Sequence, residues 1–373
     1  MTERERQILG WIRENPMISQ QELADKAGIA RSSAAVHISN MMKKGIILGK
    51  GYIIREEDDI VVVGGVNMDI CGTPAQTLIP ADSNPGRVTM SLGGVGRNIA
   101  HNLRLLSQPV RLITAFGDDL NAAKIQNSCL DLGIDVSDSL VVPGAATSSY
   151  LFITDENGEM QLAVSDMEIY SHLTPEFLSG KLDIINRAGL CVVDTNIPQE
   201  TIEFLAERAT VPLFVDPVST TKMHKLQNIL SRIHTFKPNR LEAELLTGIH
   251  ITDESSLKLA AGLLLNAGIK RVFISLGDKG VFAADRSANV LLPAIPTQVR
   301  NTTGGGDCFM AGLAYAYKRG LTLAESAQIA LAAGSICSEG DHTINEELSE
   351  HSLYERAGMR FPDDDIDEDW TME

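Results

Sequence analysis

Cysteine is scarce in this sequence of 373 residues, and its spacing excludes two classes of protein. The five cysteines are odd in number, widely spaced and free of any CxxC or Cys/His ligand pattern, so neither a disulfide framework nor a structural zinc site is expected. Long apolar runs are also missing. No stretch approaches the roughly 20 residues of a membrane span, and the charged start MTERERQ lacks the apolar stretch of a secretory signal. These absences predict a cytoplasmic protein without a membrane segment.

Basic residues are outnumbered in the chain as a whole, with 32 Lys and Arg against 49 Asp and Glu. This balance argues against a whole-protein affinity for nucleic acid. The charges are unevenly spread, because residues 1–55 hold nine basic and five acidic residues, whereas the remainder holds 23 and 44. Apolar residues make up 44% of the chain, which is enough for a conventional core. A small basic module therefore precedes an acidic globular body.

The basic module alternates helical periodicity with short breaks. One apolar helix face lies at 8–12, and Ser19 is placed as the N-cap of a second helix, with Glu22 completing a capping box. A third helix is expected over 31–44, followed by a two-stranded wing over 46–54. Its expected inward residues are Val36, Ile38, Met41 and Met42.

Three helices followed by a wing resemble the winged helix-turn-helix domains of bacterial regulators. The resemblance implies that the third helix enters the major groove of DNA. The side chains expected at base edges are Ser32, Ser33, His37 and Asn40, and those expected at phosphates are Arg31, Lys43, Lys44 and Lys50. A degenerate module kept for dimerisation is the alternative. Operator binding requires two copies, so a homodimer is expected.

Beyond an acidic hinge at 56–59, buried strands alternate with helical segments. Strand candidates lie at 60–63, 190–193, 213–215, 235–236 and 271–275, and helical stretches such as 97–106 and 199–209 lie between them. The alternation predicts an α/β fold with a mainly parallel sheet covered by helices.

Two stretches of the body, 73–91 and 147–166, depart from this pattern. The second alternates polar and apolar residues around Glu156-Asn157-Gly158, as a hairpin does. Together they predict a small β-lid. The acidic stretch 361–373 is expected to be solvated and poorly ordered.

A glycine-rich turn, TTGGGD over 302–307, precedes a strongly helical stretch. The glycines allow several N–H groups and the positive end of a helix to point at one anion. Asp307 places a carboxylate beside that anion site, where a base can take a proton from a phosphoryl acceptor. The alternative is a connecting turn that Asp307 merely caps.

Two further motifs, GGVNMD over 64–69 and GGVGRN over 93–98, accompany this turn. Together they resemble the ribokinase-like (PfkB) sugar and nucleoside kinases over roughly residues 60–350. The resemblance implies a doubly wound sheet with a β-lid, Asp307 as general base, and an anion hole formed by Gly304, Gly305 and Gly306. It also implies a substrate site that contains Asn67, Asp69, Gly94 and Asn98. The expected domains are then residues 1–55 for DNA, 60–350 for the kinase, and 351–373 as an acidic tail.

Two later segments fit the nucleotide side of that family. KPNRLE over 237–242 is similar to its Asn-x-x-Glu element, so Asn239 and Glu242 are expected to organise Mg²⁺, largely through water. SLGDKG over 275–280 is similar to its phosphate-contact loop, so Ser275, Gly277 and Gly280 are expected at the ATP phosphates. Taken singly, Glu242 could be a helix-surface residue and the second segment a plain turn.

Within the family, the motifs GGVGRNIA, VSDME, DTNIP and DPVSTTK look most similar to pseudouridine kinases. Asp166 and Asn196 are therefore further substrate-side candidates, and Lys222 is a further nucleotide-side candidate. Each has a structural alternative as a lid turn, a loop cap or a solvated helix start. Asn301 stands where many sugar kinases of the family have Asp, which argues against potassium activation.

The resemblance predicts an ATP-dependent kinase that phosphorylates the 5'-hydroxymethyl group of a nucleoside, with pseudouridine preferred. Two alternatives remain at this point. One is a sugar kinase of the same family. The other is a transcription regulator whose kinase-like body senses a ligand, although a sensor would not need to keep the base, the anion hole and the Asn-x-x-Glu element together.

Overall fold

The computed structural model describes residues 2–44, 46–47 and 59–362. The chain divides into two compact units, Met1–Glu57 and Asp58–Glu373, and each is described by itself. The expected wing beyond residue 47, with Lys50, lies outside the described residues. So do the hinge at 56–58 and the acidic stretch from 363.

Three helices make up the described part of the first unit: α1 (Glu3–Glu14), α2 (Gln20–Ala27) and α3 (Arg31–Lys43). A capping box opens each of the first two, with Ser19 and Glu22 bonded reciprocally at the start of α2, as predicted. The helices share one apolar core, which includes Ile8, Leu9, Ile12, Leu23, Ile38 and Met41.

The inward face of α3 differs from the predicted one. Val36 is 59% exposed and Met42 is 45% exposed, whereas Ala34 is buried beside the expected Ile38 and Met41. Residues 34, 38 and 41 repeat at helical spacing, and residue 36 lies roughly half a turn away from them. The prediction for Val36 and Met42 was therefore wrong.

The second unit is built on an eight-stranded sheet in the order β14-β13-β12-β11-β10-β9-β1-β4. Neighbours from β4 to β12 run parallel, and β13 and β14 are antiparallel additions at one edge. The strands are β1 (Ile60–Val63), β4 (Val110–Ile113), β9 (Leu190–Asp194), β10 (Leu213–Asp216), β11 (Thr235–Phe236), β12 (Arg271–Ser275), β13 (Val281–Asp285) and β14 (Asn289–Leu292). A short separate pair joins β5 (Ala115–Phe116) to β6 (Leu140–Val141).

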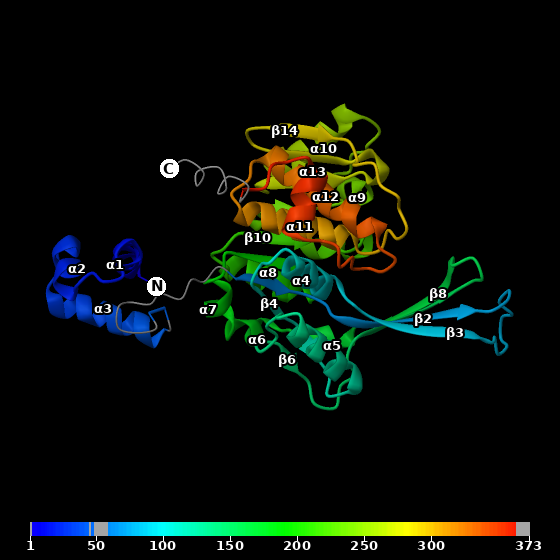
Figure 1. The fold of residues 1–373 in the computed structure, drawn as a ribbon, viewed down its shortest axis with the longest axis horizontal. Helices are drawn as coiled ribbons and strands as arrows, with labels where there is room; N and C mark the ends of the chain where they lie inside the picture. The colour runs from blue at the N-terminus through cyan, green and yellow to red at the C-terminus, as the bar shows by residue number, and fades with distance from the viewer. Residues whose placement is uncertain (1, 45, 48–58, 363–373) are drawn as a thin grey trace, which may run out of the picture. The chain divides into compact units, whose positions relative to one another are not determined.

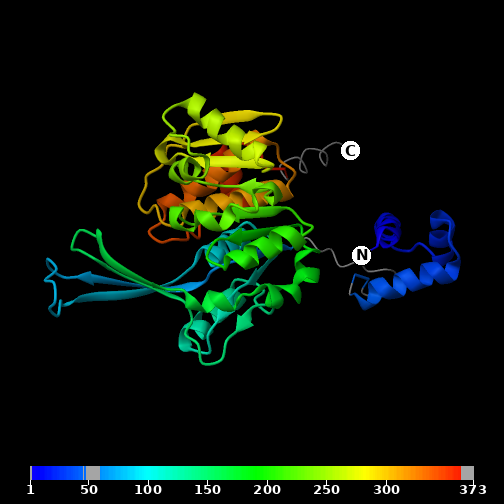
Figure 2. The ribbon, with the colours of Figure 1, turned by 180° about the vertical axis from the view of Figure 1, so that it is seen from behind.

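Helices cover both faces of this sheet, as Figures 1 and 2 show. They are α4 (Val95–Leu105), α5 (Leu120–Asp131), α6 (Pro175–Ser179), α7 (Leu182–Ile185), α8 (Gln199–Arg208), α9 (Arg240–Thr247), α10 (Glu254–Asn266), α11 (Gly305–Lys318), α12 (Leu323–Glu339) and α13 (Glu350–Ala357). Four short 3₁₀ turns accompany them: Glu168–His172, Thr220–Leu226, Leu230–Arg232 and Gly277–Lys279.

Alternate residues of β1 enter opposite cores. Val61 and Val63 belong to the apolar cluster that includes α8 and α10, whereas Ile60 and Val62 belong to the cluster that includes α4 and α11. The uninterrupted apolar run of this strand reflects burial on both faces. The predicted doubly wound, mainly parallel α/β fold is confirmed.

A second sheet of four strands, ordered β3-β2-β7-β8, forms the predicted lid. Its strands are β2 (Asn67–Pro74), β3 (Gly86–Gly93), β7 (Ser149–Thr154) and β8 (Met160–Asp166). Figures 1 and 2 show the sheet projecting from the layered body of the second unit.

The two faces of the lid differ in character. The strand register puts Val88, Met90, Leu151, Leu162 and Val164 on one face, and all five are exposed. This set is called the lid apolar face below. The opposite face carries Asp69 in register with Tyr150 and Ser91. Among the described residues of either unit, no helix combines the length and apolar character needed to cross a bilayer.

Candidate active site

The N-terminus of α11 is shaped to receive an anion. Gly304 is its N-cap with a φ of 84°, and a Cβ there would lie 2.3 Å from the carbonyl oxygen of Thr343, so only glycine fits. Gly305 and Gly306 begin the first turn, where backbone N–H groups have no partner within the helix. The three predicted anion-hole glycines therefore lie at the positive end of a helix of 14 residues.

Asp307 lies in the same turn and contacts the start of α4. Asn98 Nδ2 donates a hydrogen bond to Asp307 Oδ2 at 2.8 Å. Asn98 Oδ1 is buried and accepts no hydrogen bond within the part of the chain that the structure describes. This hydrogen bond joins two motifs that are 209 residues apart in sequence. It leaves Asn98 Oδ1 as an acceptor that a ligand can use.

Close backbone packing makes this contact possible. Gly94, the N-cap of α4, has a φ of 99°, and a Cβ on it would lie 2.5 Å from the carbonyl oxygen of Gly65. A Cβ on Gly96 would lie 2.9 Å from the backbone of Gly64. The glycines of the two GG motifs therefore let α4 approach the end of β1, which brings Asn98 to Asp307.

The surroundings of Asp307 hold its carboxyl partly protonated at neutral pH. Burial, followed by the negative charge of Asp216, raises the pKa of Asp307 to about 7. The amide of Asn98 and the ammonium of Lys237 oppose this rise, because both favour the charged carboxylate. A carboxyl that titrates near neutral pH can accept a proton and later release it.

The predicted residues of the first motif lie at the base of the lid. Asn67 Nδ2 donates to Asp69 Oδ1, and burial raises the pKa of Asp69. A Cβ on Gly93 would lie 2.0 Å from Asp69 Oδ2. The carboxylate therefore lies over the neighbouring strand β3 at a position where only glycine leaves room for it. Asp69 therefore belongs to the lid sheet and not to the central sheet.

Lys222, predicted on the nucleotide side, contacts Asn196, predicted on the substrate side. Lys222 Nζ donates to Asn196 Oδ1, and Asn196 Nδ2 lies 2.9 Å from where a Cβ on Gly65 would be. Burial lowers the pKa of Lys222. Asp166 is exposed at the end of β8, where it pairs with Ser149. The structure places Lys222 with the substrate-side candidates and not at the nucleotide-side cavity.

A cavity of about 570 Å³ borders the α11 N-terminus. Ser275, Gly277 and Gly280, predicted from the SLGDKG segment, line it together with Gly305 and Gly306. The remaining lining residues are Lys237, Asp278, Ala294, Ile295, Pro296, Thr297, Val299, Thr302, Phe309, Leu331, Gly334, Ser335 and Ser338. This mixture of apolar and polar lining residues is typical of a small-molecule site.

Asn239 and Glu242 form the capping box that opens α9. Asn239 N donates to Glu242 Oε2 at 2.8 Å, and Glu242 N donates to Asn239 Oδ1 at 2.9 Å. Burial raises the pKa of Glu242. No cluster of three or more His, Cys, Asp or Glu suited to holding a metal occurs among the described residues.

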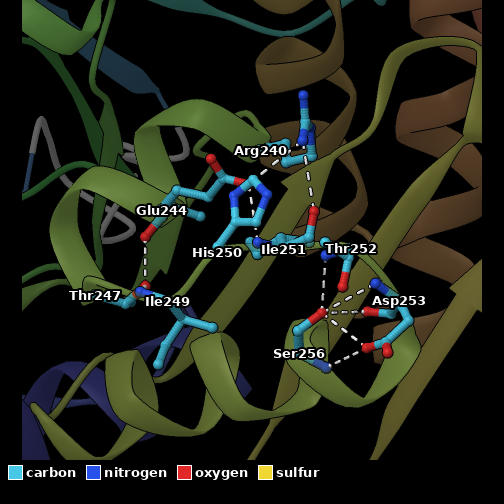
Figure 3. A network of polar contacts seen from close by, with 10 residues as sticks. Arg240, Glu244, Thr247, Ile249, His250, Ile251, Thr252, Asp253 and Ser256 are labelled. Atoms are coloured by element: carbon cyan, nitrogen blue, oxygen red, sulfur yellow. Dashed lines mark hydrogen bonds and ion pairs between the residues drawn. The ribbon is translucent and has the colours of Figure 1, made fainter.

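The loop after α9 holds that helix in place, as Figure 3 shows. Glu244 Oε1 accepts from Ile251 N at 2.9 Å and pairs with Arg240 at 3.3 Å and with His250 at 3.4 Å. Ser256 then ties the loop to the start of α10. The network ties Arg240 and Glu244 of α9 to Ile251 in the loop that follows the helix.

Three charged residues at the centre of the site were missed from the sequence. Asp194 and Asp216 end the parallel strands β9 and β10, and Lys237 directly follows β11. Asp194 Oδ2 accepts from Gly65 N at 2.8 Å, and Asp216 Oδ2 lies 3.3 Å from Lys237 Nζ. Their position at the carboxyl ends of parallel strands was the available signal, because ligands bind at that edge of such sheets.

In the first unit, most predicted DNA contacts lie on the outer side of α3. Arg31, Ser32, Ser33 and Lys43 are exposed, and His37 and Asn40 are half-buried. Lys44 Nζ forms an ion pair with Glu5 at 3.0 Å. Val36 and Ser39, which were not predicted to face outward, lie on the face opposite the core together with Ser32 and Asn40.

Known proteins share both units. Residues 57–349 match the pfkB family of carbohydrate kinases, and residues 1–47 match a winged helix-turn-helix DNA-binding family. The Escherichia coli K12 protein described as uncharacterized sugar kinase YeiI is 37% identical over 94% of this chain and 97% of its own. The pseudouridine kinase of the same organism is 40% identical over 79% of this chain and 95% of its own. A structure of Arabidopsis thaliana ribokinase with ribose and ATP, 22% identical, has a TM-score of 0.71 over 81% of this chain and 99% of its own. The chain belongs to the pfkB family of carbohydrate kinases, which transfer phosphate to a hydroxyl acceptor, and it carries a winged helix-turn-helix unit in front of the kinase fold.

Proposed function

We propose that this chain is an ATP-dependent kinase that phosphorylates the 5'-hydroxymethyl group of a nucleoside, with pseudouridine as its substrate. The observation that carries the proposal is the hydrogen bond from Asn98 to Asp307, which joins a substrate-side motif to the anion site. The 40% identity to a pseudouridine kinase supports this choice of nucleoside. The similarity to YeiI supports a sugar as the alternative acceptor.

In the proposed reaction, Asp69 and Asn98 bind the ribose hydroxyls, and the 5'-hydroxyl lies beside Asp307. Asp307 takes the hydroxyl proton while the hydroxyl oxygen forms a bond to the γ-phosphorus of ATP. The bond from that phosphorus to the bridging oxygen breaks, and ADP leaves with the electron pair. The N–H groups of Gly305 and Gly306 stabilise the charge on the transferring phosphoryl group.

The cavity of about 570 Å³ is the proposed ATP site, with Ser275, Gly277 and Gly280 near the phosphates. Glu242 and, by way of water, Asn239 would hold Mg²⁺, because Mg²⁺ needs few carboxylates when phosphates and water complete its shell. When bound, Mg²⁺ would neutralise part of the phosphate charge. Glu242 and Asn239 remain oriented by their mutual hydrogen bonds.

A coupled assay of ADP release over a panel of nucleosides and sugars tests this function. Pseudouridine is expected to give the highest kcat/KM, and the product should carry its phosphate on the 5'-oxygen. A sugar that exceeds every nucleoside would establish the sugar-kinase alternative. A protein that binds a nucleoside but turns over none of the panel would instead be a ligand sensor.

We also propose that the first unit binds DNA through α3. The support is its match to a DNA-binding family and the exposed polar residues Arg31, Ser32, Ser33 and Lys43. Selection from a library of genomic fragments at low salt is the direct test. Failure to enrich any fragment would assign the module to protein interaction or dimerisation.

A homodimer is part of the proposal, because operator half-sites require two copies of the module. The lid apolar face offers an extensive exposed surface for pairing, and surfaces of this kind mark interaction sites. Placing a charge there with Leu162→Lys is expected to produce monomers in sedimentation velocity. A Gln161→Lys variant, on the opposite face of the same strand, is the matched control.

A further inference from the structure

Lys237 occupies the junction between the anion site and the nucleotide-side cavity. The residue directly follows β11, and its backbone N donates to Val215 O at 3.5 Å, which ties it to β10. Its side chain is only 9% exposed. Lys237 Nζ lies 3.3 Å from where a Cβ on Gly306 would be, so the ammonium faces the first turn of α11.

The charge at this junction is distinctive. Among the described residues that line the cavity, Lys237 is the only Lys or Arg. Asp216 Oδ2 lies 3.3 Å from the ammonium and holds it in place.

A buried ion pair of this kind does little for stability by itself, because desolvation of both charges offsets their attraction. An ammonium placed beside helix N–H groups and a proton-accepting carboxyl is, however, suited to bind a phosphoryl oxygen. Asp216 engages only one side of the ammonium, and the cavity lies on another.

We infer that Lys237 is a catalytic residue that binds an oxygen of the γ-phosphoryl group of ATP as it passes to the acceptor hydroxyl, and that Asp216 is the residue that positions it. The inference rests on the proposed function and assigns a role to Lys237 that its motif does not imply. During transfer, negative charge moves from the γ-phosphoryl oxygens to the bridging oxygen that leaves on ADP. The ammonium, beside the first turn of α11, stabilises this negative charge while the proton passes to Asp307.

The test replaces the charge with an apolar side chain of similar length, Lys237→Met. Turnover is expected to fall about 10²–10³-fold, as when one transition-state donor is removed. In titration calorimetry, affinity for ADP should change by less than about threefold, whereas affinity for the β,γ-imido analogue of ATP should weaken about tenfold or more, because only the analogue carries the γ-group. Lys124→Met is the matched control. Lys124 is an exposed lysine on α5, outside the site, and its loss should leave all three quantities within about twofold.

A second variant separates catalysis from charge balance. If Lys237 serves only to neutralise Asp216, then Lys237→Met combined with Asp216→Asn should restore turnover to within about threefold of the unmodified protein, and that result overturns the inference. If turnover stays low in this double variant, the inference is supported. The double variant also replaces the single variant if Lys237→Met does not fold. An equal loss of affinity for ADP and for the β,γ-imido analogue of ATP in Lys237→Met overturns the inference as well. If the unmodified protein phosphorylates no acceptor, the proposed function fails, and the two affinities still decide whether Lys237 contacts a γ-phosphoryl group.

Discussion

At the scale of the residue, Asp307, with a pKa of about 7, can act as a general base near neutral pH. Asp307→Asn removes the base but keeps the size of the side chain and its contact with Asn98. Turnover is expected to fall by about 10²–10⁴-fold with little change in affinity for ATP, because only proton removal is lost. Asp131→Asn, an exposed carboxylate at the end of α5, is the control in the same assay. Full residual turnover in Asp307→Asn would reject Asp307 as the base.

The pH profile offers an independent measurement on the same carboxyl. Asn98 stabilises the charged form of Asp307, so its loss raises the pKa further. Activity needs the deprotonated carboxylate, and the acid limb of log kcat against pH should therefore move to higher pH in Asn98→Ala. A shift of about half to one pH unit is expected from the loss of one hydrogen bond. Asn67→Ala removes the corresponding donor to Asp69 and should leave the limb in place. If the acid limb of log kcat does not move in Asn98→Ala, the limb reports the titration of a group other than Asp307.

At the scale of the element, α11 has left-handed glycines at both ends, and only one of them is crowded. Gly304 at the N-terminus has Thr343 O within 2.3 Å of a Cβ position, whereas Gly320 beyond the C-terminus has nothing within 4 Å. Alanine at either position should cost about 1–2 kcal/mol of unfolding free energy for the backbone conformation. Gly304→Ala should in addition lower kcat about tenfold or more, because the first turn must move away from its anion. Equal kcat in the two variants would show that the exact placement of this turn does not matter.

At the scale of the whole molecule, catalytic and DNA-binding functions are expected to separate at the boundary between the two units. Deleting residues 2–57 should leave kcat/KM within about twofold and abolish DNA binding, since the site residues all lie in the second unit. In the full chain, log affinity for DNA should fall linearly with log salt, as release of counterions requires. Loss of catalysis in a truncated protein that remains folded would show that the units are coupled.

Much of this fold was predictable, because the patterns that encode it are local. The apolar run of β1, the glycine motifs and the capping box at Ser19 each depend on residues within a few positions of one another. Burial on both faces of a parallel strand demands continuous apolar residues, and a close backbone approach with positive φ at the start of a helix demands glycine. These patterns are local, so the sequence by itself determined the α/β class, the lid and the glycines that open α11.

Tertiary structure alone decided which side chains meet. Lys237, Asp216 and Asp194 come from three neighbouring strand ends, and no spacing rule in sequence shows that they surround Asp307. The raised pKa of Asp307 depends on burial by distant elements, and sequence does not reveal it. The outward position of Val36 was likewise missed, because an apolar side chain on a helix is assigned inward until its partners are known. Long-range packing sets distance and desolvation, and both act through space and not along the chain.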